Sequence, residues 1–198
     1  MASTNNATRP PTSTQLATAL PGPTTYITGH APSGDAVIHA ARPVQWTHHD
    51  DGKIAMSVAY TTTFPANLND DADLAAHDAR AAAGPMGLVG KGGTVLRYVD
   101  FAPGHECMMH RTRSVDYGIV VEGTVLAVMG SGETRRMGRG DVMVQRATMH
   151  SWRNPSETEW ARMVFVLQDC EALVVGGRTM GEDLGRGTDG VPPSGNDD

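Results

Sequence analysis

The chain has 198 residues, of which 39% are hydrophobic, with 23 glycines and 12 prolines. This length suits one domain with flexible ends, and the glycine and proline content favours a β-rich domain with many turns over a helical bundle. The net charge of −6 argues against nucleic acid as a partner. The sequence holds no run of about 18 apolar residues, so it predicts no membrane span.

The two ends of the chain are predicted to lie outside the folded domain. Residues 1–23 are rich in Thr, Ser, Asn and Pro, and such a segment buries too little apolar surface to offset the entropy of ordering. We expect a disordered N-terminal arm there, or an arm that orders on a partner subunit. Residues 181–198 have a similar composition and are expected to form a flexible tail, which leaves one barrel domain over residues 24–180.

The N-terminus and the cysteine count predict a cytoplasmic protein. The first residues lack the basic start and apolar core of a secretory signal. The two cysteines, Cys107 and Cys170, are too few for a disulfide framework and suit partly buried thiols in a reduced compartment.

Hydrophobic alternation with a period of two predicts short strands through most of the chain. In the first half, strands are expected at 24–30, 35–39 and 54–64. An acidic start and an alanine run then predict a short helix at 68–84. In the second half, strands are expected at 94–101, 107–121, 124–129, 134–137, 141–145, 150–154 and 160–168. Many short strands separated by glycine turns are typical of an all-β sandwich or barrel.

Two segments, 104–123 and 140–154, resemble the two sequence motifs of the cupin superfamily. This resemblance implies a double-stranded β-helix, also called a jelly-roll barrel. In the family, the first motif supplies two His and a Glu, and the second supplies one His, all to a single metal. The residues of the first motif resemble those of small single-domain cupins of fungi and actinobacteria, some of whose genes lie beside natural-product pathways.

The motif positions name the candidate catalytic residues. His110 and His150 stand where the family has metal-binding histidines, Asp116 stands where the Glu belongs, and Thr112 replaces the second His. The resemblance therefore implies that His110, Asp116 and His150 carry the chemistry, and that they hold the metal if one is bound. A hydroxyl is a poor ligand for a borderline divalent ion, so Thr112 predicts a metal held more weakly than by four ligands, or absent altogether.

Strand alternation predicts which further side chains share the pocket. His110, Thr112, Ser114 and Asp116 fall on one face, and polar groups on an inward face cost free energy unless they are paired or bind something. We therefore expect Thr112 and Ser114 to contact the substrate.

Two other residues of the second motif are candidate substrate contacts. Trp152 shares the parity of His150, so its indole is expected either to stack on a flat unsaturated substrate or to fill the core. Arg146 is expected either to meet a carboxylate or phenolate of the substrate or to lie on the surface.

Three functions fit this residue set. The first is an acid–base lyase or isomerase that acts on a small oxygenated substrate of polyketide-like or aromatic type. The second is a mononuclear non-haem iron dioxygenase, because two His and one carboxylate form the ligand set of the facial triad. The third is a non-enzymatic binder of small molecules. One divalent ion, Zn, Fe, Mn or Ni, is a possible cofactor, and a metal-free site fits as well.

Single-domain cupins commonly form dimers in which an N-terminal strand is exchanged between sheets. The strands expected at 24–30 and 35–39, preceded by a loose arm, suit this arrangement. We therefore expect a homodimer, with neither nucleic acid nor a membrane as a partner.

Overall fold

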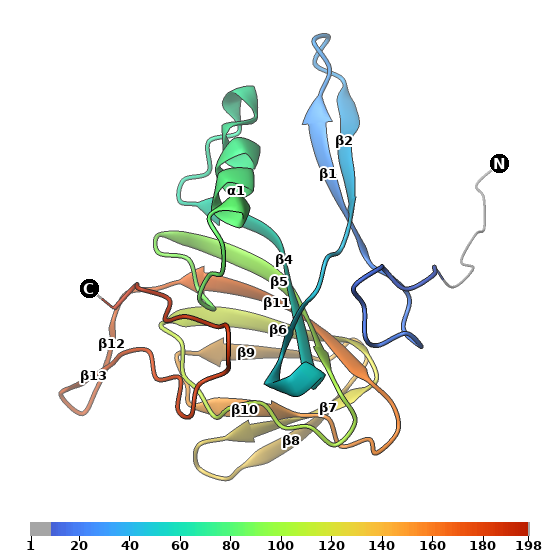
Figure 1. Ribbon diagram of the computed structural model, residues 1–198. Helices are drawn as coiled ribbons and strands as arrows, with labels where there is room; N and C mark the ends of the chain where they lie inside the picture. Colours follow the sequence, from blue (N-terminus) through green and yellow to red (C-terminus); the bar gives the residue numbers. More distant parts are fainter. Residues whose placement is uncertain (1–8, 198) are drawn as a thin grey trace.

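Most of the buried residues lie on one six-stranded sheet and on a three-stranded sheet that faces it (Figure 1). The computed structural model describes residues 9–197. Neighbours in the larger sheet are antiparallel, in the order β3 (Thr47–His49), β4 (Ile54–Thr63), β5 (Gly93–Phe101), β11 (Ala161–Asp169), β6 (Ser114–Glu122) and β9 (Val142–Arg146). The smaller sheet has the order β10 (His150–Arg153), β7 (Thr124–Met129) and β8 (Thr134–Gly138). The predicted all-β double-stranded β-helix is confirmed.

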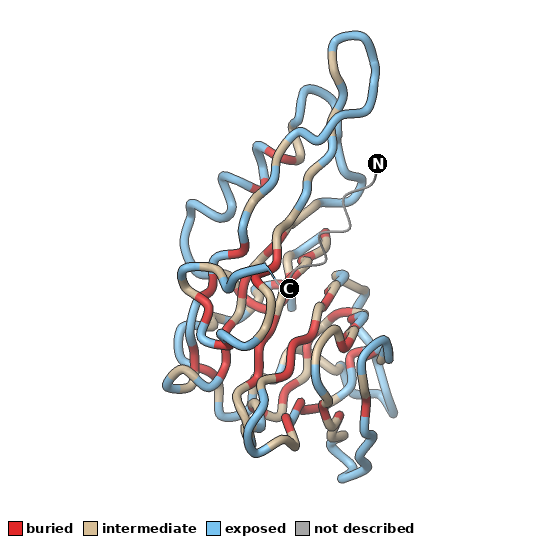
Figure 2. The backbone as a smooth tube through the Cα atoms, turned by 90° about the vertical axis from the view of Figure 1, so that its right-hand side faces the viewer, coloured by how far each residue is buried: buried red, intermediate tan, exposed pale blue. Residues whose placement is uncertain are grey.

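The core lies between the two sheets because the central strands alternate apolar and polar residues. Along β5, for example, Val95, Val99 and Phe101 are buried, and up to Val99 the buried positions alternate with partly exposed ones; beyond it Asp100 is buried too, where it pairs with Arg162. β11 adds Met163 and Leu167 to the same interior cluster. Figure 2 shows that the buried residues gather in the barrel, while the segments that project from it are largely exposed.

Two elements stand away from the barrel, namely the hairpin of β1 (Thr24–His30) and β2 (Ala36–Pro43) and the helix α1 (Ala72–Ala82) (Figures 1 and 2). Two 3₁₀ turns, Asp50–Gly52 and Asn69–Asp71, precede β4 and α1. The predicted helix is shorter than expected, because its first residues form the second of these turns. No helix of the described residues has the length and apolar character needed to cross a membrane.

The segment before β6 differs from the prediction. The alternation predicts a single strand over 107–121, but residues 107–113 form only isolated bridges to other segments, among them His110 with His150. Their backbone nitrogens and oxygens bond reciprocally at 2.8 Å. The alternation of inward and outward side chains nevertheless continues through this segment. The bridge between His110 and His150 joins the first motif directly to the second.

The N-terminal segment follows a course that its composition does not reveal. Residues 1–8 of the expected disordered arm lie outside the described residues, and residues 9–23 pack on the barrel. Trp46 donates from its backbone to Thr14 and from its indole to Thr12, and Arg162 donates to the carbonyl of Pro21. Hydrogen bonds hold much of this segment, and only a few small apolar residues such as Ala17 are buried in it, which is why hydrophobicity did not predict its course. The homodimer stays a prediction.

The C-terminal segment also lies against the barrel instead of extending from it. A short hairpin of β12 (Leu173–Val175) and β13 (Arg178–Met180) leads into residues 181–197. Asp183 then pairs with Arg111 through two backbone hydrogen bonds, and the fully buried Asn196 donates to Arg113 and Asp169. Polar pairing thus holds residues 181–197 against the barrel where apolar surface is missing, and the flexibility expected of this tail stays a prediction.

Candidate active site

A cavity of about 50 Å³ lies inside the barrel, between the two sheets. Its walls are mostly apolar, with side chains such as Ile54, Val99, Phe101, Phe165 and Leu167. Four ionisable side chains with nitrogen or oxygen atoms line it, from three strands and from the segment between β5 and β6: Arg97, His110, Asp116 and His150; the hydroxyl-bearing Thr188 of the C-terminal segment lines it as well. A dry, mostly apolar cavity with a few convergent polar groups is the usual form of a small-molecule site.

The two predicted histidines face each other in this cavity. Their ring centroids are 4.4 Å apart, and each ring directs Nδ1 at the backbone carbonyl two residues earlier, Met108 for His110 and Thr148 for His150. Nδ1 must carry the proton to donate to a carbonyl, so Nε2 of each neutral ring is an acceptor. Among the described residues, neither Nε2 forms a hydrogen bond.

Burial keeps both rings neutral. It lowers the pKa of His110, and it lowers the pKa of His150 to about 3, where the neighbouring His110 charge adds to the effect. At neutral pH the pair therefore presents two lone pairs to the cavity. Such atoms accept hydrogen bonds from hydroxyl groups, but they are weak bases.

Asp116 has the opposite perturbation. Burial raises the pKa of its carboxyl to about 6, and the effect is only partly opposed by hydrogen bonds from Ser114 and Thr112 and by the charge of Arg97. Ser114 donates to one carboxyl oxygen at 2.5 Å and Thr112 to the other at 3.2 Å. A carboxyl with a pKa near neutrality takes up and releases protons readily at physiological pH.

The hydroxyls of Thr112 and Ser114 orient the carboxylate and do not line the cavity. Both side chains are almost fully buried, and Ser114 also contacts Thr112 at 2.8 Å. Their contact with the substrate stays a prediction, whereas their contact with Asp116 is what the structure has. Strand alternation placed them inward correctly, but their short side chains are engaged by Asp116.

The aromatic candidate of the second motif lies at the cavity, and the cationic candidate does not. Trp152 lines the cavity and meets the His150 ring edge-on, with centroids 5.5 Å apart. Arg146 is exposed at the end of the edge strand β9, opposite Val115, and takes no part in the cavity. Of the two positions expected for Arg146, the structure has the surface one, because the parity of Arg146 in β9 directs it outward.

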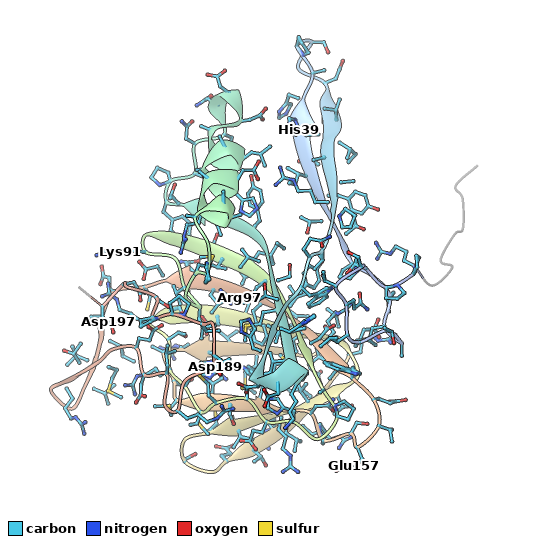
Figure 3. All side chains as sticks on the ribbon, in the orientation of Figure 1. His39, Lys91, Arg97, Glu157, Asp189 and Asp197 are labelled. Carbon is cyan, nitrogen blue, oxygen red and sulfur yellow. The ribbon has the colours of Figure 1, made fainter. Side chains whose placement is uncertain are left out.

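Sequence reasoning missed a charged residue in the cavity wall. Arg97 is 4% exposed and lies in the middle of β5, and Figure 3 shows it in the central part of the molecule among the strands. Desolvation lowers the pKa of Arg97 to about 10, so the group remains charged at neutral pH. Its signal was present in the sequence, since Val95, Arg97 and Val99 share one parity and a charge on an inward face needs a reason.

The cavity thiol is inert. Cys107 lines the cavity, and burial raises its pKa to about 12. The neutral thiol is neither a nucleophile nor a metal ligand in this state. Both cysteines are free and partly buried, as expected.

The donor set does not match a metal centre held by the protein alone. Across residues 9–197, no group of three His, Cys, Asp or Glu side chains is placed to hold a metal ion. His110 and His150 offer two nitrogen donors, but the oxygens of Asp116 are engaged by two hydroxyls. The three predicted ligands therefore line one cavity without forming a ligand cluster.

Comparison with known proteins identifies the family. A family model described as a cupin domain matches residues 97–167. The phomopsin biosynthesis cluster protein D of Diaporthe leptostromiformis is 41% identical over 88% of this chain and 93% of its own length. The chain belongs to the cupin family.

The chain is also similar to a second fungal protein and to one bacterial protein of known structure. The cupin-domain-containing oxidoreductase fogC of Aspergillus ruber is 40% identical over 81% of this chain and 79% of its own length. Among solved structures, the polyketide cyclase RemF of Streptomyces resistomycificus aligns with a TM-score of 0.42 and 13% identity. That alignment covers 70% of this chain and 78% of the cyclase.

Proposed function

We propose that this cupin is an enzyme that moves protons on a small oxygenated substrate, in a dehydration, a decarboxylation or a keto–enol shift. The observation that carries the proposal is the buried carboxyl of Asp116. Its pKa of about 6 means that both the protonated and the ionised form are populated near neutral pH. Relatives named as proteins of the phomopsin and oryzines biosynthesis clusters support a place in natural-product biosynthesis, and the polyketide-like or aromatic character of the substrate is part of the proposal.

Each cavity residue then has a defined task. The ionised Asp116 removes a proton from a carbon next to a carbonyl and returns it to another position, while Thr112 and Ser114 hold the carboxylate in one orientation. The free Nε2 atoms of His110 and His150 accept hydrogen bonds from substrate hydroxyls. Trp152 forms a flat wall, and the apolar lining excludes water.

Solvent exchange tests this proposal even while the product is unidentified. The protein is incubated in D₂O with a panel of 2-oxo acids, 3-hydroxy acids and aromatic keto acids, and proton NMR follows the loss of the C–H signal next to the carbonyl. We expect catalysed exchange whose rate rises with pH through about 6 and then levels off, because Asp116 acts as a base only when ionised. A rate that is independent of pH between about 5 and 8, or no exchange across the panel, would count against the proposal.

Redox chemistry is the second candidate, because the relatives from Aspergillus ruber, Neurospora crassa and Hypocrea virens are named cupin-domain-containing oxidoreductases. An iron dioxygenase would have to hold its metal through His110 and His150 with a third ligand from outside the described protein donors.

Elemental analysis separates the two candidates. The wild-type protein and a His110→Ala/His150→Ala double variant are purified without chelator, and their metal content is measured. We expect less than about one tenth of a metal ion per chain in the wild type, because two nitrogen donors alone bind weakly. Stoichiometric iron that is lost in the double variant would favour the dioxygenase and call for oxygen-uptake assays.

A further inference from the structure

Two buried arginines in this chain have opposite surroundings. Arg162 is 3% exposed and makes a bidentate pair with Asp100, at 2.6 and 2.7 Å, and donates to Pro21 as well. Arg97 is 4% exposed, yet within residues 9–197 no carboxylate oxygen lies within 4.0 Å of its nitrogens. Arg162 is a structural residue whose charge is compensated by a close ion pair, whereas the charge of Arg97 is opposed by Asp116 only from beyond ion-pair distance.

The guanidinium of Arg97 is only partly hydrogen-bonded. One terminal nitrogen donates to the carbonyls of Gly87 and Leu88, at 2.8 and 3.1 Å, and the other contacts the sulfur of Met56 at 3.8 Å. Its Nε is buried and has no partner among the described residues. Leaving a buried donor unpaired destabilises the fold, and more so for a charged group, so an unpaired buried N–H of this kind points to a missing acceptor.

A second unpaired polar atom lies in the wall of the same cavity. Thr188 belongs to the C-terminal segment, is 7% exposed, and its buried hydroxyl also lacks a partner in the described part of the chain. Thr188 comes from the C-terminal segment and Arg97 from β5, and both line this cavity. One ligand in the cavity that bonds to both would satisfy both unpaired groups.

The chemistry of the two groups selects the ligand. Arg97 offers N–H donors and a desolvated positive charge, and a buried cation is stabilised chiefly by an anion with good hydrogen-bond geometry. The hydroxyl of Thr188 can donate to a second oxygen of the same group. The acidic side chain that lines the cavity, Asp116, is engaged by Ser114 and Thr112.

We infer that Arg97 and Thr188 bind the carboxylate of the substrate, so that this cupin acts on a carboxylic acid. The inference rests on the proposed function, because it takes the cavity of Asp116 to be the place of reaction. It assigns to Arg97 the contact that the second motif suggests for Arg146.

The surroundings of Arg97 also show where the rest of such a substrate can lie. Arg97 and Met56 line the inner cavity on one side and a groove of about 550 Å³ on the other. Side chains of α1, such as His77 and Arg80, line this groove, as do Gly190 and Val191 of the C-terminal segment. A carboxylate held at Arg97 in the inner cavity therefore lies beside the groove, and an opening between the two spaces would let a larger substrate extend into it.

Binding of benzoate tests the inference without any turnover. Benzoate and its neutral isostere benzamide are titrated by calorimetry, and the side-chain Nε–H signal of Arg97 is followed by NMR after assignment with an Arg97→Lys variant. We expect benzoate to bind at least about tenfold more tightly than benzamide and to shift the Arg97 signal, because a charge-assisted hydrogen bond contributes about 1.5–3 kcal/mol.

Thr188→Val removes only the hydroxyl and keeps the shape of the side chain. We expect it to weaken benzoate binding about fivefold, which corresponds to about 1 kcal/mol. Thr179→Val, at an exposed position of β13, is the matched control and should leave binding unchanged. Equal affinities for benzoate and benzamide, absence of benzoate binding, or equal effects of the two valine variants would each overturn the inference.

The two proposals can fail separately. Asp116→Asn is expected to retain benzoate binding, because the carboxylate of Asp116 is not part of the anion contact. Benzoate binding without C–H exchange on any acid would reject the proton-transfer function and leave the anion site standing. Exchange without a preference for benzoate over benzamide would reject the anion site alone.

Discussion

Asp116→Asn is expected to abolish C–H exchange and at the same time to make the folded protein more stable above neutral pH. The amide cannot take up a proton, so we expect the exchange rate to fall at least about a thousandfold, as for loss of a general base together with the orientation it imposes. The stability gain follows from the burial of the carboxyl, which is 3% exposed. Burial raises the pKa of Asp116 to about 6 from an ordinary value of 3.8.

The sign of this effect depends on pH. Between about pH 4 and pH 6 the folded protein binds the Asp116 proton more tightly than the unfolded chain does, so the contribution of Asp116 to stability falls as pH rises through this window. Above about pH 6 the ionised carboxylate destabilises the folded state by about 3 kcal/mol at about 1.36 kcal/mol per pKa unit. Weaker bonds to Ser114 and Thr112 in the variant offset part of this, which leaves an expected gain of about 2 kcal/mol.

Urea unfolding at about pH 7.5 and at about pH 4 measures the gain. The difference between the variant and the wild type should be about 2 kcal/mol at the higher pH and should shrink towards zero at the lower, where Asp116 is protonated in the folded state. Asp35→Asn, at the exposed tip of the β1–β2 hairpin, controls for general loss of charge and should change stability little at either pH. A variant that is less stable than the wild type at the higher pH would show that Asp116 is a structural residue.

The inward face of the first motif could be predicted because alternation survives where regular pairing does not. His110, Thr112, Ser114 and Asp116 are all buried, although the strand proper begins only at Ser114. Alternation also places Arg97 on the inward face of β5, but no motif of the sequence draws attention to that position.

Other features depend on contacts that no local pattern encodes. Thr188 lies in a segment of glycine, proline and acidic residues, and it reaches the cavity only because Asp183 and Asn196 pair with Arg111 and Arg113 across the barrel. The hydroxyl contacts of Asp116 likewise depend on side-chain reach. Sequence spacing places a residue on a face, but it does not tell whether a short side chain faces the ligand or the neighbouring carboxylate.

The contrast between the two buried arginines leads to the second large effect. Arg162→Met is expected to lower the free energy of unfolding by about 3–5 kcal/mol, the usual cost of removing one partner from a buried ion pair. It leaves Asp100 charged and fully buried, deprives the Pro21 carbonyl of its donor, and removes the guanidinium that lies 4.9 Å from the centre of the Trp46 ring. Both the sheet and the N-terminal segment lose an anchor.

Arg97→Met is the matched comparison, and it should change the free energy of unfolding by no more than about 1 kcal/mol. The variant gives up hydrogen bonds to Gly87 and Leu88, but it also removes a buried cation that lacks a carboxylate partner within the described residues, and these two effects oppose each other. Urea unfolding of both variants and of the wild type measures the two changes in the free energy of unfolding. Equal losses would show that Arg97, like Arg162, serves the fold, whereas the expected inequality means that the chain keeps an uncompensated charge in its cavity for a ligand.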